Sequence, residues 1–193
     1  MLVKADPLTG TKEKVLEEAL HGVAQACVLT TSYPRTMIQI VVQIVHDDGS
    51  VLAAAVNAMT LALLDAGLAM RTTITAASVA YMPGSPDAWL DPTAAETEVR
   101  GRLTARRAPK ALSLTAAWPL RRGSRTQAAE SVHTAAVATT SPDDVVMAES
   151  LGAFSAQQLL DARQAAAHAS AAVVEFLRTA LERSHKRGTA KRA

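Results

Sequence analysis

The sequence predicts an α+β domain in which helices stack on a mixed sheet. Three segments support this class. Residues 11–29 carry apolar side chains at three- and four-residue spacing, which indicates an amphipathic helix. Residues 36–46 alternate as a strand does, and residues 51–66 are apolar almost all round, which indicates a helix covered on both sides. At 193 residues, the chain is long enough for one domain with a substantial core.

The composition narrows the class of protein further. The net charge of +2 argues against neither nucleic-acid nor protein partners. A single cysteine, Cys27, rules out an intramolecular disulfide framework and fits a reducing compartment. Asn57 and Asp65 interrupt the apolar run at 51–69, so no membrane-spanning helix is expected. The N-terminus has no apolar signal core, so we do not expect secretion.

A proline and an alternating strand follow the first helix. Pro34 separates the two elements, because the residue before a proline avoids helical geometry. One face of the strand over 36–46 is wholly aliphatic and the other is mixed, which suggests a sheet packed on helices. The aliphatic face comprises Ile38, Ile40, Val42 and Ile44.

An Asp-Asp-Gly-Ser turn at residues 47–50 connects this strand to the apolar helix. Gly49 can adopt the left-handed conformation that a tight turn requires, and Ser50 is a good N-cap. Gly67 is the expected C-cap. We therefore predict that a strand, a tight turn and a buried helix form one continuous unit.

The second half of the chain combines short strands with one irregular segment. Strands are predicted over 71–81, 88–90, 96–105 and 145–147. Residues 106–142 are rich in Ala, Arg, Ser, Thr and Pro and have no steady period. We interpret them as a flexible loop inserted between strands.

A long helix is predicted at the C-terminus. Ser155 and Gln158 fit a capping box at its start, and the helix is expected over about 156–184. The basic tail at 185–193 is expected to fray. No strand is predicted before the first helix, so the sheet is expected to lack strands on that side.

Few side chains have the spacing of a catalytic or metal site. We interpret Asp47 and Asp48 mainly as turn and helix N-terminal charges, with a metal pair as the open alternative. Asn57 is interpreted as a buried amide that bonds nearby backbone, with a functional role as the alternative. No histidine has ligand spacing or a nucleophile partner. The histidines are His21, His46, His133, His168 and His185.

Residues 99–125 contain seven arginines, one lysine and no acidic residue. One interpretation is contact with RNA phosphates, which would weaken with salt. The other is a solvated loop. We weigh both evenly for Arg100 and Arg102, which lie on a predicted strand, and favour the solvated loop for the rest. No aromatic stacking platform is interleaved, which argues against independent base recognition.

Six short pieces of the sequence form a specific combination. They are Tyr33-Pro34-Arg35-Thr36, Val45-His46-Asp47-Asp48-Gly49-Ser50, Ala53 to Ala58, Leu61 to Gly67, Met70-Arg71, and Leu90-Asp91-Pro92-Thr93 with Glu96. Together these pieces resemble the RNase PH fold, specifically the RNase PH-like ring subunits of the eukaryotic RNA exosome. The resemblance implies a ribosomal protein S5 domain 2-like mixed sheet packed with helices, as one domain over 1–193 that lacks the usual N-terminal strands. The Leu-Asp-Pro-Thr piece favours the non-catalytic forty-six-type subunit.

The same resemblance implies that a phosphate site is lost. Active family members hold phosphate with Gly-Thr-Arg at the start of the buried helix, where backbone N–H groups and a guanidinium bind a dianion. The matching positions here are Ser50, Val51 and Leu52. Active members carry a second phosphate-binding arginine at the first helix. The matching residues here are 11–13, where Lys12 is at best a substitute for that arginine.

Active members also carry two aspartates six residues apart on the strand after the Leu-Asp-Pro-like turn. The matching positions are Thr97 and Leu103 within one residue, and Glu96 and Glu98 could partly fill the first. The resemblance therefore implies that the phosphorolytic acid is absent as well.

The implied function is a non-catalytic structural subunit of the exosome core ring that supports 3'-to-5' RNA processing and degradation by helping to form the RNA-threading channel. Implied partners are other RNase PH-like subunits, cap proteins with OB or KH folds, and RNA in the channel, with Arg35, Arg100 and Arg102 as candidate contacts. No cofactor, metal or membrane is implied. The implied location is the nucleus and nucleolus, and also the cytoplasm.

Two other functions stay open at this point. One is a phosphate-independent nuclease that acts as a homodimer with a divalent metal, using Glu96, Glu98, Asp91 or Asp47. The other is a stand-alone RNA-binding module, which would require the basic run to bind RNA without partners.

Overall fold

The computed structural model describes the backbone of residues 2–6, 11–82, 85, 87–97, 115–116, 129–139 and 144–190. Side chains are described within 14–82, 85, 87–97, 129–139, 144–183 and 185–186. The described residues form two sheets, a parallel pair β1–β2 and a larger sheet in the order β4-β3-β6-β7, with β5 also paired to β3. The strands are β1 (Leu2–Asp6), β2 (Gln39–Gln43), β3 (Ile74–Tyr81), β4 (Ala88–Leu90), β5 (Thr115–Ala116), β6 (Ser131–Ala138) and β7 (Val145–Gly152).

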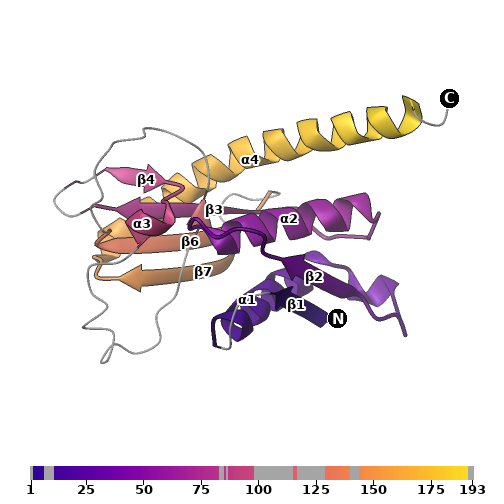
Figure 1. Ribbon diagram of the computed structural model, residues 1–193, viewed down its shortest axis with the longest axis horizontal. Coiled ribbons are helices and arrows are strands. Elements are labelled where there is room, and N and C mark those ends of the chain that lie inside the picture. Colours follow the sequence, from indigo (N-terminus) through magenta and orange to yellow (C-terminus); the bar gives the residue numbers. More distant parts are fainter. Residues whose placement is uncertain are drawn as a thin grey trace.

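Helices cover both faces of the larger sheet, with α4 on one side and α1 and α2 on the other (Figure 1). Alternate residues of β3 contribute to two cores. Ala76 packs with α1 and α2, whereas Val79 packs with Ala162 and Ala166 of α4. The predicted α+β class, with helices packed on sheet, is confirmed, and the parallel and antiparallel pairings lie in separate sheets. The helices are α1 (Thr11–Cys27), α2 (Val51–Asp65), α3 (Ala94–Thr97) and α4 (Ala156–Ala190), with a 3-10 turn at Thr30–Ser32.

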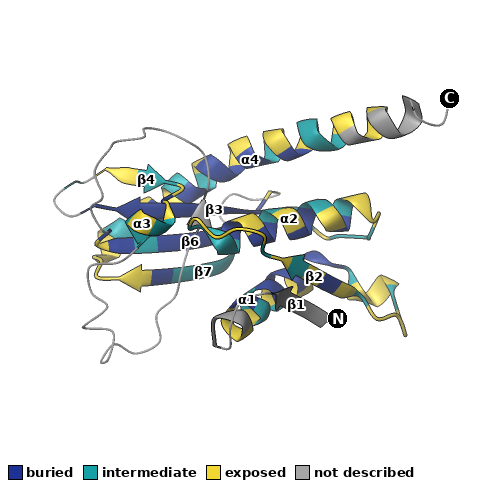
Figure 2. Cartoon of the chain, in the orientation of Figure 1, coloured by how far each residue is buried: buried dark blue, intermediate teal, exposed yellow. Residues whose placement is uncertain are grey.

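Helix α2 is covered on one side only, so the expectation of a helix without a wet face is wrong. Its outward residues Ala54, Ala58 and Ala62 are exposed, while Val56 and Met59 are buried. Figure 2 shows exposed and buried stretches alternating along α2. Alanine has the highest intrinsic helix propensity and little apolar surface, so it suits a solvent-facing helix position. Apolar residue type alone therefore overestimated the burial of this helix.

Asn57 and Thr60 of α2 bond the backbone of β3. The Asn57 Nδ2 donates to the carbonyl of Ala76 at 3.0 Å, and its Oδ1 accepts from the Ala76 N–H at 2.9 Å. The Thr60 hydroxyl donates to the carbonyl of Ile74 at 2.7 Å. Strands β4 and β5 pair with β3 only at residues 77–81. The side chains of Asn57 and Thr60 therefore supply hydrogen-bond partners for the backbone of Ile74 and Ala76, where these two strands do not pair with β3. The structural interpretation of Asn57 is confirmed.

Strand β6 lies inside the segment predicted as a flexible loop, and that prediction is wrong for residues 131–138. The strand occupies the middle of the sheet between β3 and β7. Seven of its eight residues are buried, so its sequence shows no alternation of apolar and polar residues. The β-branched residues Val132, Thr134 and Val137 were the available signal.

Other boundaries also differ from expectation. Residues 96–97 end the short helix α3 instead of starting a strand, and 98–105 lie outside the described residues. Strand β1 precedes the first helix, contrary to the expectation that no strand does. Strand β7 is longer than predicted. Helix α4 continues to Ala190, so the tail expected at 185–193 is helical over its described part.

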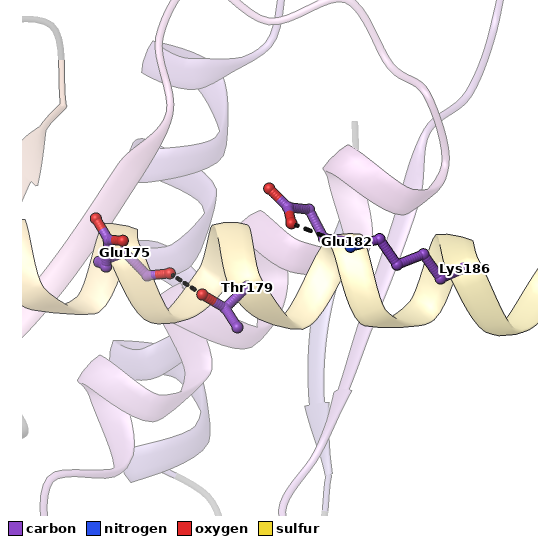
Figure 3. Close-up of polar contacts among 4 residues, drawn as sticks. All are labelled: Glu175, Thr179, Glu182 and Lys186. Atoms are coloured by element: carbon purple, nitrogen blue, oxygen red, sulfur yellow. Dashed lines mark hydrogen bonds and ion pairs between the residues drawn. The ribbon is translucent and has the colours of Figure 1, made fainter.

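Helix α4 begins at the predicted capping box. The Ser155 N–H donates to Gln158 Oε1 at 2.7 Å, and the Gln158 N–H donates to the Ser155 hydroxyl at 3.2 Å. The C-terminal half extends past the sheet (Figure 1). Two of its surface contacts are local: Thr179 donates to the carbonyl of Glu175 at 3.0 Å, and Lys186 lies 3.8 Å from Glu182 (Figure 3). Within the described residues, no helix combines the length and apolarity needed to cross a membrane.

Candidate functional site at the start of helix α2

Two backbone segments meet at the start of α2, namely the turn at residues 47–50 and the segment at 91–94. The carbonyl of Asp48 accepts a hydrogen bond from the Ala94 N–H at 2.7 Å. Within the turn, the Gly49 N–H donates to Asp47 Oδ1 at 3.0 Å. The side chain of Asp47 therefore closes the turn, as the main interpretation predicted, whereas Asp48 joins the turn to the facing segment through its backbone carbonyl.

Gly49 is required by both conformation and space. Its φ is +94°, a region that residues with a side chain rarely adopt. A Cβ at this position would lie 2.6 Å from the carbonyl oxygen of Pro92 and 2.8 Å from the amide nitrogen of Ala94. The facing backbone thus occupies the space that a side chain would need.

Ser50 occupies the N-cap position, but its hydroxyl does not cap the helix. The hydroxyl donates instead to the carbonyl of Pro92 at 3.2 Å, and the residue has a left-handed φ of +54°. The N–H groups of Ala53 and Ala54 bond the Ser50 carbonyl. The expected side-chain cap is therefore wrong, because the facing segment competes for the hydroxyl.

The facing segment is stabilised by a cap of its own. Glu96 Oε2 accepts from the Thr93 N–H at 2.8 Å and from the Thr93 hydroxyl at 2.9 Å. These bonds start the single turn of α3. Glu96, which the nuclease interpretation assigned to catalysis, is thus committed to a local structural bond.

The electrostatic environment of the site is acidic. Partial burial raises the pKa of Asp91, the Ser50 side chain opposes this, and the charges of Asp48 and Glu96 raise the pKa further. Val51 and Leu52 are half-buried and pack against the core formed by α1 and α2. A phosphate dianion would face carboxylates and a carbonyl here, without a cation at positions 50–52. Among the described residues, the two charges that act on the pKa of Asp91 at this helix N-terminus are both negative.

The fold and part of the sequence have known counterparts. Residues 4–69 match the model of the 3' exoribonuclease family, domain 1, RNase PH. A crystal structure of Rrp46 from rice (Oryza sativa) superposes with a TM-score of 0.71 at 21% identity, covering 94% of this chain and 71% of that one. The chain has an RNase PH-like fold. The resemblance to this fold is confirmed.

Curated relatives of the RNase PH-like chain include exosome complex component rrp46 of Schizosaccharomyces pombe, 38% identical over 73 residues, or 36% of this chain and 32% of the relative. Exosome complex component RRP41 of Homo sapiens is 46% identical over 66 residues, which cover 34% of this chain and 27% of the relative. Exosome complex component MTR3 of Homo sapiens is 37% identical over 93 residues, which cover 48% of this chain and 34% of the relative. The chain matches about a third or less of the length of these relatives.

The remaining predicted site residues of the RNase PH-like chain do not gather at the start of α2. Arg35 is exposed in the loop before β2, with a left-handed φ of +64°. The Thr97 hydroxyl donates to the carbonyl of Ala94 at 2.9 Å. Among the described residues, no group of three or more His, Cys, Asp or Glu side chains is arranged to hold a metal ion. Outside the described residues lie Arg100, Arg102, Glu98 and Leu103, and the side chain of Lys12.

Sequence reasoning missed a buried polar cluster beneath the start of α4. His133 is fully buried, and its ring nitrogens lie 3.0 Å from the hydroxyl of Ser150 and 2.9 Å from that of Ser131. Phe154 and Tyr81 contact the ring edge-on. Burial lowers the pKa of His133 to about 4. The histidine has no sequence motif, since its partners are single serines on its own and a neighbouring strand.

Proposed function

We propose that this protein is a non-catalytic structural subunit of the core ring of the RNA exosome. It helps to close the ring beside other RNase PH-like subunits and contacts OB- or KH-fold cap proteins. RNA passes through the channel so formed during 3'-to-5' processing and degradation. The proposal is supported by similarity to three proteins named as exosome components, together with the RNase PH-like fold.

The observation that carries the non-catalytic part is the start of α2. In active family members this position binds phosphate, the nucleophile of phosphorolysis. Here the Ser50 hydroxyl is bonded to the Pro92 carbonyl, and Val51 and Leu52 contribute apolar packing. Asp48, Asp91 and Glu96 add negative charge nearby: burial is the main cause of the raised pKa of Asp91, and the charges of Asp48 and Glu96 raise that pKa further. An attacking phosphate would therefore be repelled where it should be held.

RNA contact and cellular location follow the same proposal. Arg35 is the described member of the three arginines proposed to contact channel RNA, and it is exposed. Its guanidinium can bond phosphate oxygens without reading sequence. The proposed location is the nucleus and nucleolus, together with the cytoplasm. Fluorescence microscopy of the tagged protein tests this independently of its activity.

A degradation assay tests the proposal. The full chain is purified alone and together with co-expressed RNase PH-like subunits, then incubated with a 3'-labelled single-stranded RNA with and without inorganic phosphate. We expect stable assembly with those subunits and no phosphate-dependent release of nucleoside diphosphates by the chain alone. Phosphate-dependent release by the chain alone would contradict the non-catalytic role. Failure to assemble with any RNase PH-like subunit would contradict the ring role.

The same assay examines the metal-dependent nuclease. Its candidate acids are partly committed, because Glu96 caps Thr93 and Asp47 closes the turn at Gly49. Manganese or magnesium is added without phosphate, and EDTA serves as the control. Metal-dependent cleavage that Glu96→Gln abolishes would favour the nuclease over the structural subunit. A salt titration of RNA binding by the chain alone examines the stand-alone RNA-binding module.

A further inference from the structure

The end of α4 concentrates positive charge on a helix that leaves the body of the domain. Residues 175–190 lie in the half of α4 that extends past the sheet, and we name them the α4 arm (Figure 1). Residues 175–193 contain six arginines and lysines and two acidic residues, and therefore have a net charge of +4. The whole chain has a net charge of +2, so the residues before 175 are net negative. Such a basic C-terminal segment is typical of contact with nucleic acid.

An exposed aromatic ring lies on the α4 arm. Phe176 is 54% exposed, whereas its apolar neighbours Val173 and Leu177 are only 6% and 4% exposed. The inward face of the helix is therefore already packed, and Phe176 lies outside that face. An exposed phenylalanine ring gains little from burial within the fold, but its flat π-surface can stack on an unpaired base.

Phe176 and Arg183 lie on the same side of the helix. Seven residues make almost two turns, so the two positions are about 20° apart around the axis and about 10 Å apart along it. Glu175 and Glu182 repeat at the same interval, but about 100° away from that side. Glu182 is also paired with Lys186 at 3.8 Å. Among the described side chains, that of Arg183 has no ion-pair or hydrogen-bond partner, so its charge is available to a ligand.

We propose that the α4 arm binds single-stranded RNA, with a base stacked on Phe176 and a phosphate bonded by Arg183. An aromatic ring beside cations is the combination with which proteins hold single strands without reading their sequence. The guanidinium supplies a planar fork that matches phosphate oxygens. In a duplex the bases are already stacked on one another, so the ring of Phe176 favours unpaired RNA. The choice of RNA as the nucleic acid rests on the proposed function.

The α4 arm fits two other kinds of partner less well. A helix that lies on an anionic membrane needs a continuous apolar face, but Val173 and Leu177 are buried within the fold. The centre of a protein interface is depleted of charged residues, whereas Phe176 shares its side of the helix with a cation. The exposed surface of the arm therefore matches a polyanion with unpaired bases.

Fluorescence anisotropy of the full chain with a labelled single-stranded RNA tests the stacking contact. Phe176→Ala should raise the dissociation constant by about fivefold or more. Leu160→Ala is the matched control and should leave the constant unchanged, because Leu160 is 53% exposed and lies in the first half of α4, which packs on the sheet. Far-UV circular dichroism verifies that each variant is folded.

The salt dependence of the same binding tests the phosphate contact. Arg183→Gln should reduce the slope of log affinity against log salt concentration by about 0.7, the value for one phosphate contact on a single strand. Arg163→Gln is the matched control, because Arg163 is an exposed arginine in the first half of the same helix. This control should leave the slope unchanged.

Three results would overturn the proposal. These are an affinity that Phe176→Ala and Leu160→Ala change equally, equal or tighter binding of an RNA duplex, and binding of phosphatidylserine vesicles in place of RNA. The measurements use the chain alone, so they are separate from assembly with RNase PH-like subunits. A chain that assembles with those subunits but binds RNA independently of Phe176 would refute the arm and leave the ring role intact. A chain that binds RNA through Phe176 but does not assemble would refute the ring role and leave the arm intact.

Discussion

Replacing Gly49 with alanine should destabilise the protein more than the same substitution at Gly22 or Gly67. The left-handed backbone costs a residue with a side chain about 1–2 kcal/mol. In addition, the new Cβ would lie 2.6–2.8 Å from the backbone of Pro92, Thr93 and Ala94. Relief of that clash requires the facing segment to move, because backbone atoms cannot rotate away.

The movement would weaken two hydrogen bonds, from Ala94 N–H to the Asp48 carbonyl and from the Ser50 hydroxyl to the Pro92 carbonyl. Each contributes about 1 kcal/mol, and with the backbone cost the free energy of unfolding should fall by about 3–4 kcal/mol. Urea denaturation followed by circular dichroism measures this loss, provided that the slope with urea is unchanged.

Two further glycines separate the contributions. Gly67 has a φ of +65° and open space around its Cβ position, so Gly67→Ala should cost only about 1 kcal/mol through the backbone. Gly22 lies within α1 with open space and no left-handed φ, so Gly22→Ala should stabilise by about 0.5–1 kcal/mol. A loss at Gly49 no larger than that at Gly67 would refute the close approach of residues 91–94.

Three other predictions concern the cores and the surface. Burial favours the neutral form of His133 in the folded state. Its contribution to the free energy of unfolding should therefore be fully present above pH 6.5 and should be lost as the pH falls toward 4, by about 3 kcal/mol in total. An acid denaturation curve that is unchanged in a folded His133→Gln variant would contradict this. Asn57→Ala should cost about 2–3 kcal/mol in urea denaturation, since it leaves the N–H and carbonyl of Ala76 without their partner, and an effect below 0.5 kcal/mol would exclude that role. Lys186→Ala should change stability by less than about 0.5 kcal/mol, because its ion pair with Glu182 is exposed, and a larger loss would show that the end of α4 is packed.

Local sequence signals predicted the central unit well. The turn at 47–50, the helix that follows and the capping box at Ser155 appear where turn chemistry and periodicity placed them, because each depends on residues within a few positions. The amide of Asn57 was also interpreted correctly, since an apolar helix offers such a group few partners besides nearby backbone.

Strand β6 could not be recognised in the same way. Its residues are buried on both faces, so the alternation that marks a half-buried strand is missing, and its neighbours in sequence are rich in loop-forming residues. The hydrogen bond between His133 and Ser150 depends on the pairing of β6 with β7, which no local sequence pattern predicts.

The α+β class, the strand–turn–helix unit and the absence of Gly-Thr-Arg at positions 50–52 can all be read from neighbouring residues. What lies against the start of α2 depends on how the chain folds back, because Pro92 and Asp91 come from a segment more than forty residues away. Turns and helix caps depend on residues a few positions apart, whereas contacts between distant segments depend on the path of the whole chain.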